Sequence, residues 1–312
     1  MTKIEKKSIL YLSASRKFYT LINCIAFEGV AYDGCYRGFS SIVMYYIISM
    51  WYALKLPFAR ILFNPKIKDY SGVIIASDSM FFCGLYKYIR KKNPNARLIQ
   101  YYQNKVRHPH YIKLAREYGW DVWTFNPTDA KKYGIKINPA FGSKKYFDQF
   151  KPKEPTEYDI VFIGRCKGRM DYIRNLASEP TVSGLRWYLY FVTHPFYKRY
   201  LSREDRKIYK KPLPYEKTLE IVAKSTSVLE VQDTGADGVI LRNIEAMFME
   251  KKTISTNARL KEMDFYHPDN IFIIGDDDIS KLPQFIKTPY HPIDEEILSR
   301  YTVDAWINRF LD

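Results

Sequence analysis

Short apolar runs alternate with helix-like stretches along the first half of the chain. Runs of strand length lie at residues 9–12, 72–76, 97–101 and 121–125, and helix-like segments follow Ser40 and occupy residues 82–91 and 109–118. Strands separated by helices are typical of parallel βαβ units, because a parallel neighbour is reached only through a crossover. The pattern therefore predicts an α/β domain with a doubly wound sheet.

The second half shows the same alternation after a charged segment that contains two prolines. This segment, KPKEPTE at residues 151–157, is the best candidate for a linker, since its prolines stiffen the chain. Strands are expected at residues 158–164, 187–192, 227–231, 253–255 and 271–274, and the terminal DEEILSRYTVDAWINRFL predicts an amphipathic helix. Because 312 residues exceed one core of ordinary size, we predict an N-terminal domain at 1–150, a C-terminal domain at 151–290 and a terminal helical segment at 291–312.

Positive charge is concentrated in the predicted N-terminal domain. The net charge of the chain is +15, and residues 1–150 hold 24 Lys and Arg against 9 Asp and Glu, which accounts for all of it. Such a charge indicates an anionic partner: nucleic acid, an acidic lipid surface or a phosphorylated glycolipid. No nucleic-acid recognition motif occurs and the aromatic content of 16% suits a membrane interface, so we favour a lipid surface over nucleic acid and over a merely solvated basic face.

Residues 42–58, IVMYYIISMWYALKLPF, are almost uncharged. The run is at the lower limit for a membrane-spanning helix and Lys55 interrupts it. We therefore expect a core helix or a helix that dips into the membrane interface, rather than a span.

The cysteines give no sign of a disulfide framework. Cys24, Cys35, Cys83 and Cys166 have neither paired nor metal-binding spacing, which fits a reduced chain. The apolar run near the N-terminus is too short for a signal peptide. These features predict a cytoplasmic protein, and the basic domain predicts that it is peripheral on the inner face of the cytoplasmic membrane.

The most informative segment is 225–257, where a strand, a glycine loop, a helix and a second strand follow one another. The loop contains Asp233, Gly235 and Gly238, and the helix carries Arg242 and Glu245. A loop that opens a helix at the carboxyl end of a parallel strand presents backbone N–H groups to a phosphate. Asp233 can bind hydroxyls, and a carboxylate at Glu245 can accept from both hydroxyls of a ribose. The alternative is an ordinary crossover with a capped helix, because a lone glycine loop is a weak signal.

These residues carry a resemblance. GADGVILRNIEAMFMEKKTISTN, with the later DFYHPDNIFII, resembles the nucleotide-sugar-binding lobe of GT-B glycosyltransferases that build bacterial capsule and lipopolysaccharide, among them a lipopolysaccharide-core rhamnosyltransferase. The match spans roughly residues 158–274, and more faintly TFNPTDAKKYGIKINPAF at 124–141. The resemblance implies two Rossmann-like doubly wound domains facing across a cleft, with a terminal helix that crosses back to the first domain.

The resemblance also implies roles for individual residues. Glu245 would hold the donor ribose, and Arg242, Asn243 and the loop amides would serve the donor side. Many retaining members carry a second glutamate seven residues before the ribose glutamate, where this chain has Gly238. This departure favours inversion of the anomeric centre.

A second basic element follows the strand at 158–164. Arg165, Lys167 and Arg169, separated by Gly168, lie where the first loop of such a domain meets the ligand, so they could bind a diphosphate. A solvated turn is the alternative. Three aspartates at 276–278 are interpreted as an acidic turn that caps a helix near Ser280. GT-B enzymes usually need no metal, because cations and a helix amino end stabilise the leaving group, and we expect neither metal nor cofactor here.

An inverting reaction needs a base for the acceptor hydroxyl. In the acid-poor N-terminal half, Asp33 ranks first and Glu28 second, both in the glycine-flanked stretch FEGVAYDGCYRG, which we expect to be a loop over the strand ends. His108 in KVRHPH ranks third. Each has an ordinary alternative as a turn or surface residue.

The sequence thus predicts a metal-independent glycosyltransferase. Its donor would be a nucleotide-diphosphate sugar, with rhamnose suggested by the resemblance alone, and its acceptor a lipopolysaccharide-core or related anionic glycolipid. The alternative is a non-catalytic basic protein that docks on membrane or nucleic acid and keeps a relic donor lobe. A phosphoryl transferase is disfavoured, because no Gly-x-x-x-x-Gly-Lys loop occurs.

Overall fold

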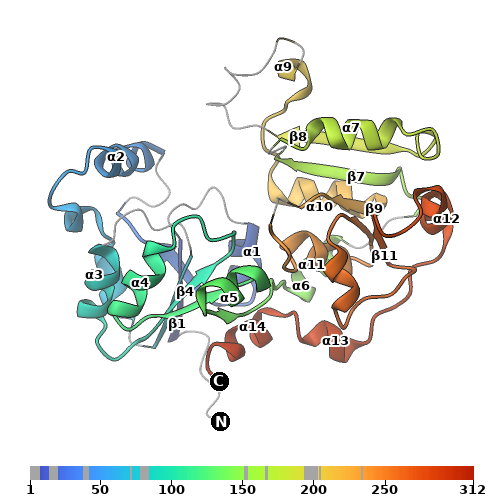
Figure 1. Cartoon of the computed structure of the whole chain (residues 1–312). Helices are drawn as coiled ribbons and strands as arrows, with labels where there is room; N and C mark the ends of the chain where they lie inside the picture. The colour runs from blue at the N-terminus through green and yellow to red at the C-terminus, as the bar shows by residue number, and fades with distance from the viewer. Residues whose placement is uncertain are drawn as a thin grey trace. The chain divides into compact units, whose positions relative to one another are not determined.

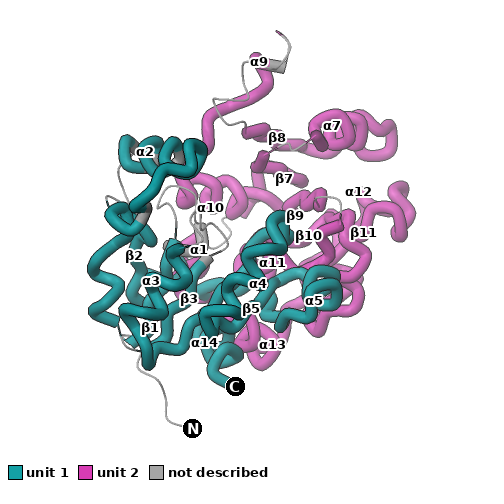
Figure 2. The backbone as a smooth tube through the Cα atoms, turned by 60° about the vertical axis from the view of Figure 1, so that its left-hand side comes forward, with its two compact units in different colours: residues 1–143, 303–312 teal, residues 144–302 magenta. Residues whose placement is uncertain are grey.

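The chain folds into two compact units, 1–143 with 303–312 and 144–302, coloured separately in Figure 2. The structure is a computed structural model that describes residues 8–13, 20–37, 42–70, 72–77, 84–150, 154–165, 168–192, 203, 205–232 and 235–312. The predicted domain boundaries lay at 150/151 and 290/291. The units divide instead at 143/144 and 302/303, so the chain returns to unit 1 within its last ten residues.

Unit 1 is built on a parallel sheet with the strand order β2-β1-β3-β4-β5-β6. Its strands are β1 (Ile9–Ser13), β2 (Ala31–Gly34), β3 (Val73–Ser77), β4 (Arg97–Tyr102), β5 (Asp121–Thr124) and β6 (Lys136–Ile137). Its helices are α1 (Thr20–Phe27), α2 (Ile42–Ala53), η3 (Ala59–Leu62), η4 (Pro65–Asp69), α3 (Gly84–Lys92), α4 (His110–Glu117), α5 (Pro127–Tyr133) and α14 (Val303–Arg309) (Figure 1). Every residue of β1 is buried, as expected for a parallel strand whose sheet is covered on both faces.

The last helix completes the core of unit 1. Trp306 of α14 is fully buried and its ring lies 4.1 Å from that of Phe141 and 5.1 Å from that of Tyr101. The backbone carbonyl of Trp306 accepts a hydrogen bond from the Asn138 amide at 2.9 Å. The predicted single terminal helix is wrong, however, because Arg300 to Thr302 separate α13 (Glu295–Ser299), which belongs to unit 2, from α14.

Unit 2 also has a parallel sheet, with the order β11-β10-β9-β7-β8. Its strands are β7 (Tyr158–Arg165), β8 (Trp187–Val192), β9 (Ser225–Glu230), β10 (Lys252–Ser255) and β11 (Ile271–Ile273). Its other helices are α6 (Lys144–Phe147), η5 (Asp148–Phe150), α7 (Met170–Ser178), α9 (Asp205–Ile208), α10 (Tyr215–Ala223), α11 (Leu241–Phe248), η6 (Ala258–Glu262), η7 (Ile279–Lys281) and α12 (Leu282–Lys287). The core strand residues are apolar on both faces, for example Ile160 and Val161.

The order of these strands defines where a ligand would bind. From β7 the chain crosses to β8 on one side, whereas from β9 it crosses to β10 on the other. Connections that diverge in this way leave a crevice outside the carboxyl ends of the two strands. The candidate site of unit 2 is therefore expected at the ends of β7 and β9.

The predicted fold class is confirmed, since both units are doubly wound parallel sheets. A second element was also wrong: the predicted loop around Asp33 forms β2, whose Asp33 pairs with Leu12. Its sequence AYDG carries little strand signal, and the fully buried β1 supplies the pairing partner instead. The described part of the predicted linker is bound to unit 2, where Glu157 forms an ion pair with Lys224 at 2.6 Å.

Helix α2 matches the predicted core or interfacial helix in position. One side of it packs on the core of unit 1 through Met44, Ile47, Ile48 and Trp51. Among the described residues, no helix has both the length and the apolar character needed to cross a membrane.

Candidate functional site

A buried glutamate ends strand β9 at the crevice of unit 2. Glu230 is 3% exposed, and its Oε2 accepts hydrogen bonds from the Asn243 amide at 2.7 Å and the Ser255 hydroxyl at 2.8 Å. Burial raises the pKa of Glu230, and these two donors oppose the shift. Glu230 therefore links the ends of β9 and β10 to the first turn of α11.

Asn243 holds the start of α11. Its Oδ1 accepts from the backbone N–H of Ile240 at 2.9 Å, while its amide donates to Glu230. A side chain three residues into the helix that accepts from the residue before the helix is half of a capping box. The oxygen and the nitrogen of the Asn243 amide thus both form hydrogen bonds within unit 2. Its predicted donor-side role would therefore be indirect: Asn243 would hold the loop before α11 in the conformation that binds the donor.

The second acid, Glu245, lies two residues after Asn243 in α11 and is also buried. Its Oε1 accepts from the Tyr215 hydroxyl of α10 at 2.7 Å, and its Oε2 lies 3.4 Å from Nε of Arg242. Arg242 in turn donates through Nη2 to the backbone carbonyl of Ile163 in β7 at 2.7 Å. Burial raises the pKa of Glu245, and Arg242 and Tyr215 oppose the shift. The residues predicted from sequence for the donor side, Arg242 and Glu245, are therefore a joined pair.

Several polar atoms of this region are buried without a hydrogen bond. They are Oε2 of Glu245, Nη1 of Arg242, Oε1 of Glu230 and Oε1 of Gln232, the last in the loop after β9. A buried polar group left unpaired costs about 1–3 kcal/mol. One donor and three acceptors are therefore open beside the crevice, and a hydroxyl-bearing ligand could satisfy some of them, because a hydroxyl both donates and accepts.

The glycine loop before α11 lies beside this pair. Gly235 is exposed and has φ of +76°, a conformation that favours glycine. Gly238 is buried and its carbonyl accepts from the Gln232 amide at 3.0 Å. The neighbouring Asp237 is bound to Arg259 at 2.7 Å, and Asp233 lies outside the described residues.

The basic loop after β7 is partly described. Arg169 half-buries its side chain and donates to the backbone carbonyl of Arg165 at 3.0 Å, which closes the loop around Gly168. Arg165 is exposed at the end of β7, the strand next to β9. Lys167 lies outside the described residues. The two described arginines are thus on the same sheet edge as Glu230, Arg242 and the glycine loop.

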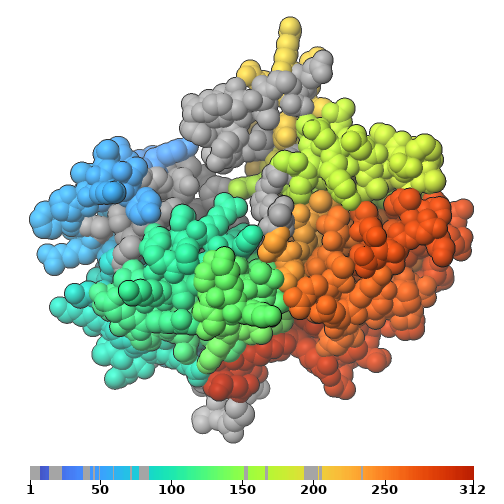
Figure 3. Space-filling model, in the orientation of Figure 1, coloured from blue at the N-terminus to red at the C-terminus, as the bar shows by residue number. Residues whose placement is uncertain are grey.

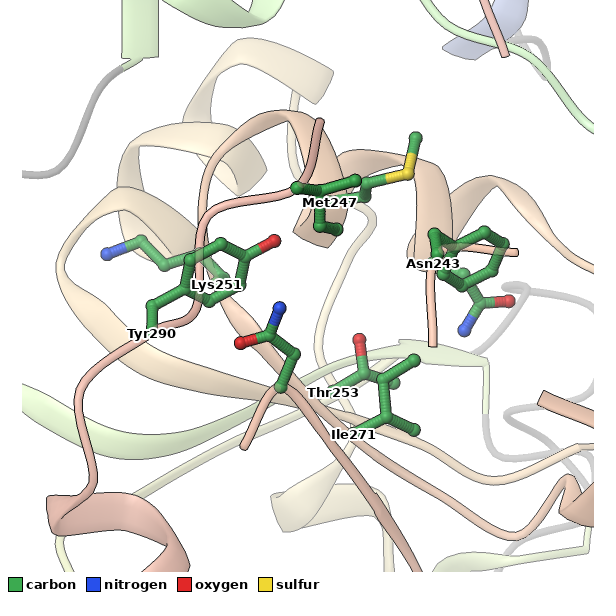
Figure 4. A pocket seen from close by; sticks show the side chains of 9 residues that line it. Asn243, Met247, Lys251, Thr253, Ile271 and Tyr290 are labelled. Carbon is green, nitrogen blue, oxygen red and sulfur yellow. The ribbon is translucent and has the colours of Figure 1, made fainter. Parts of the chain in front are cut away.

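A small pocket near α11 is separate from this network (Figure 4). It lies under the helix, between Met247 and the starts of β10 and β11, and it shares only Asn243 with the network. Lys251 points its ammonium away from the pocket in Figure 4 and donates to the carbonyl of Ala223 at 2.9 Å. The pocket therefore offers no charged group to a ligand.

The three base candidates of unit 1 do not come together. Asp33 is at the carboxyl end of β2, where its Oδ1 accepts from the N–H of Gly34 at 2.7 Å. Glu28 precedes β2 and therefore lies at the amino ends of the strands, opposite the end that carries Asp33. There it accepts a hydrogen bond from the Ser143 hydroxyl at 2.6 Å. His108 is exposed after β4, three strands from β2, or about 14 Å across the sheet.

The aspartates at 276–278 form the predicted acidic turn. Asp278 accepts from the N–H of Ser280 at 3.0 Å and caps η7, as expected. Asp276 and Asp277 form ion pairs with Lys261 at 3.4 and 3.0 Å. Lys261 of η6 therefore offsets part of their negative charge.

Solved structures resemble the whole chain, although no protein-family model and no curated protein sequence matches it. An α-glucosyltransferase in complex with UDP and DNA has a TM-score of 0.58 at 12% identity, covering 97% of this chain and 94% of that one. Sucrose-phosphate synthase from Thermosynechococcus elongatus gives 0.57 at 11%, covering 96% of each chain. Anabaena HepE in complex with UDP-glucose also gives 0.57 at 11%, covering 97% and 98%.

The chain has the GT-B fold. At these identities the likeness concerns the fold alone, and it extends over both units.

Sequence reasoning missed three members of the site: Glu230, Gln232 and Tyr215. Glu230 did leave a signal, since a charged residue that ends an apolar strand must find buried partners. Tyr215 left none, because it lies 30 residues before Glu245 and only the packing of α10 brings the two together.

Proposed function

We propose that this protein is a glycosyltransferase that uses a nucleotide-diphosphate sugar. The observation that carries the proposal is the buried Glu245–Arg242 pair, whose atoms Oε2 and Nη1 have no hydrogen bond at the crevice of unit 2. A ribose diol supplies the matching donors and acceptors. The similar structures of HepE and the α-glucosyltransferase hold UDP-glucose and UDP, which favours a uridine nucleotide.

The remaining donor-side residues suit a diphosphate. Arg165 and Lys167 would neutralise its charge, together with Arg169 and the amides of the loop with Gly235 and Gly238. Such charge stabilisation lets the nucleotide diphosphate depart without a metal ion. We therefore propose metal-independent transfer.

For the acceptor base we keep Asp33 as the first candidate. It lies at the carboxyl end of its strand, the edge at which doubly wound sheets bind ligands. His108 follows β4 at the same edge and ranks second. Glu28 now ranks last, because it lies at the opposite edge and its Oε1 is bound to Ser143.

The proposed acceptor is an anionic glycolipid of the lipopolysaccharide-core kind at the inner face of the cytoplasmic membrane. The net charge of +15 in residues 1–150 supports an anionic acceptor, and the sequence resemblance supports the glycolipid and rhamnose as the sugar. Inversion is proposed because Gly238 replaces the second glutamate of many retaining enzymes.

Calorimetric titration with UDP, GDP, CMP and dTDP, in the presence of EDTA, tests the donor site. One nucleotide should bind saturably, and Glu245→Gln should weaken it by about 1–3 kcal/mol, or roughly fivefold to 150-fold. Glu220→Gln is the matched control, since Glu220 is an exposed glutamate that pairs with Lys217. If no nucleotide binds, the non-catalytic docking protein becomes the better hypothesis.

A further inference from the structure

Helix α2 is apolar on two opposite sides. Its inner side packs on the unit 1 core through Ile48 and Trp51. Its outer side carries Val43, Tyr46, Met50 and, just beyond the helix, Leu54, which are 53–63% exposed. These positions are spaced by three or four residues and so form one stripe along the helix. A helix that is apolar all round is normally covered on both sides. The exposure of Val43, Met50 and Leu54 therefore makes the outer stripe a candidate contact surface.

The turn after α2 extends the stripe. Phe58 is 68% exposed and Ile61 52% exposed, although both are large apolar residues. Phe58 has φ of +61°, a strained conformation for an aromatic residue. The Trp51 indole donates to the carbonyl of Pro57 at 3.0 Å and so fixes the turn to the packed side of α2. Strain that the surrounding structure maintains is common at functional sites, and here it accompanies an aromatic ring in solvent.

The charged residues between positions 42 and 68 have one sign, and an exposed aspartate, Asp69, follows them. From residue 42 to residue 68 the chain contains no Asp or Glu, and its four cations, Lys55, Arg60, Lys66 and Lys68, are all exposed. We use the term α2 surface for these cations together with Val43, Tyr46, Met50, Leu54, Phe58 and Ile61. Figure 3 shows the blue atoms of α2 and the following turn on the outside of unit 1.

We propose that the α2 surface binds an anionic lipid bilayer. Apolar and aromatic side chains enter the boundary between head groups and acyl chains, while Lys and Arg contact lipid phosphates. The 12 residues of α2 are about 18 Å long against about 30 Å of hydrocarbon, so the helix lies along the surface.

A second copy of the chain is a poorer occupant. A two-fold dimer brings the same patch of both copies together, and it would therefore place four exposed cations against four others. A bilayer that contains anionic lipid has the complementary charge. This inference does not depend on the proposed transfer activity, although it would bring the enzyme to a lipid-linked acceptor.

Flotation of the purified full chain with vesicles tests the proposal. Vesicles of phosphatidylcholine with phosphatidylglycerol should bind the protein, and pure phosphatidylcholine should bind it weakly. A triple variant, Met50→Gln, Leu54→Gln and Phe58→Asn, should lose about tenfold or more in binding. Lys55→Gln with Arg60→Gln should lose about fivefold for each cation.

Matched controls distinguish binding through the α2 surface from nonspecific binding of vesicles to other exposed apolar residues. Ile137→Thr with Tyr172→Gln removes two exposed apolar residues elsewhere and should leave vesicle binding unchanged. The altered residues of the triple variant are exposed, and Asn tolerates the left-handed backbone of residue 58 better than Phe does, so its Tm should not fall below that of the wild type. Its nucleotide affinity should equal that of the wild type, which distinguishes failure of this proposal from failure of the donor site.

Three results would overturn the proposal: no binding of wild-type protein to anionic vesicles, equal binding of the triple variant, or a dimer in sedimentation that the triple variant dissolves. The last result would assign the α2 surface to a second copy. Equal binding to neutral vesicles would overturn the proposal as well, because the cations would then have no role.

Discussion

Replacing Tyr215 by Phe removes a single hydroxyl from the network around Glu245. That hydroxyl donates to Oε1 of Glu245 at 2.7 Å, and after the change the buried carboxylate keeps only Arg242, at 3.4 Å. The ring itself stays in place, since it stacks on Tyr146 with centroids 6.2 Å apart. The effect of the variant therefore reports on the hydrogen bond.

The magnitude follows from the burial of Glu245. A hydrogen bond to a buried charged group contributes about 1.5–3 kcal/mol. A loss of about 2 kcal/mol would lower the Tm of a unit with the size of unit 2 by about 4–8 °C. Nucleotide affinity should fall too, because an untethered carboxylate no longer presents Oε2 to the ribose.

The pH dependence has a definite sign. Burial raises the pKa of Glu245 in the folded state, so the folded protein holds this proton more tightly than the unfolded chain does. The protonated carboxyl favours folding at low pH, and stability is lost as the pH rises through the folded-state pKa. Without the Tyr215 hydroxyl the pKa should rise further. The variant should therefore lose more stability at about pH 7 than at about pH 5.

Thermal unfolding followed by circular dichroism at both pH values, with calorimetric titration of the nucleotide, measures these effects. Tyr172→Phe is the control, since Tyr172 is 44% exposed on α7. If Tyr215→Phe matched this control in both Tm and affinity, the hydrogen bond would have no role in either folding or binding.

Two further predictions concern other charged groups of unit 2. Burial lowers the pKa of Lys252 to about 8, so the unfolded chain binds more protons above that pH and stability should rise between about pH 8 and about pH 10. Lys252→Met should reduce this rise in urea unfolding curves, whereas the surface variant Lys217→Met should leave it unchanged. Arg165→Gln should weaken UDP by about tenfold but leave uridine binding unchanged, since uridine lacks the diphosphate. Equal losses for both ligands would place Arg165 away from the phosphates.

Much of the fold could be predicted because parallel strands are apolar over their whole length. The runs at β1, β3, β4, β7 and β9 were visible for that reason. β2 was not visible, because AYDG is not an apolar run and forms a strand by pairing with β1. The break between α13 and α14 was also hidden: Tyr301 turns into unit 2, where its hydroxyl donates to Asp264 at 2.6 Å. A helical periodicity does not reveal such a tertiary contact.

Only those residues of the candidate site that are close together in the sequence could be predicted. The glycine loop, Arg242 and Glu245 are close in sequence, and the structure joins the last two in an ion pair. Glu230 and Tyr215 belong to the same network through strand order and helix packing, which sequence spacing does not encode. Sequence therefore identified one element of the site, and topology supplied the residues that hold it.

The arrangement of these residues also explains why the site is built from buried acids. An exposed carboxylate would already be satisfied by water and would gain little from a ribose. Glu245 is instead kept dry, with Tyr215 on one oxygen and the other oxygen lacking a hydrogen bond. The folded protein bears that cost alone, and a bound diol removes it. The same desolvation that raises the pKa of Glu245 therefore increases the free-energy difference between the ligand-free and the ligand-bound site. The instability of this network and its affinity for a hydroxyl-bearing ligand thus have one physical origin.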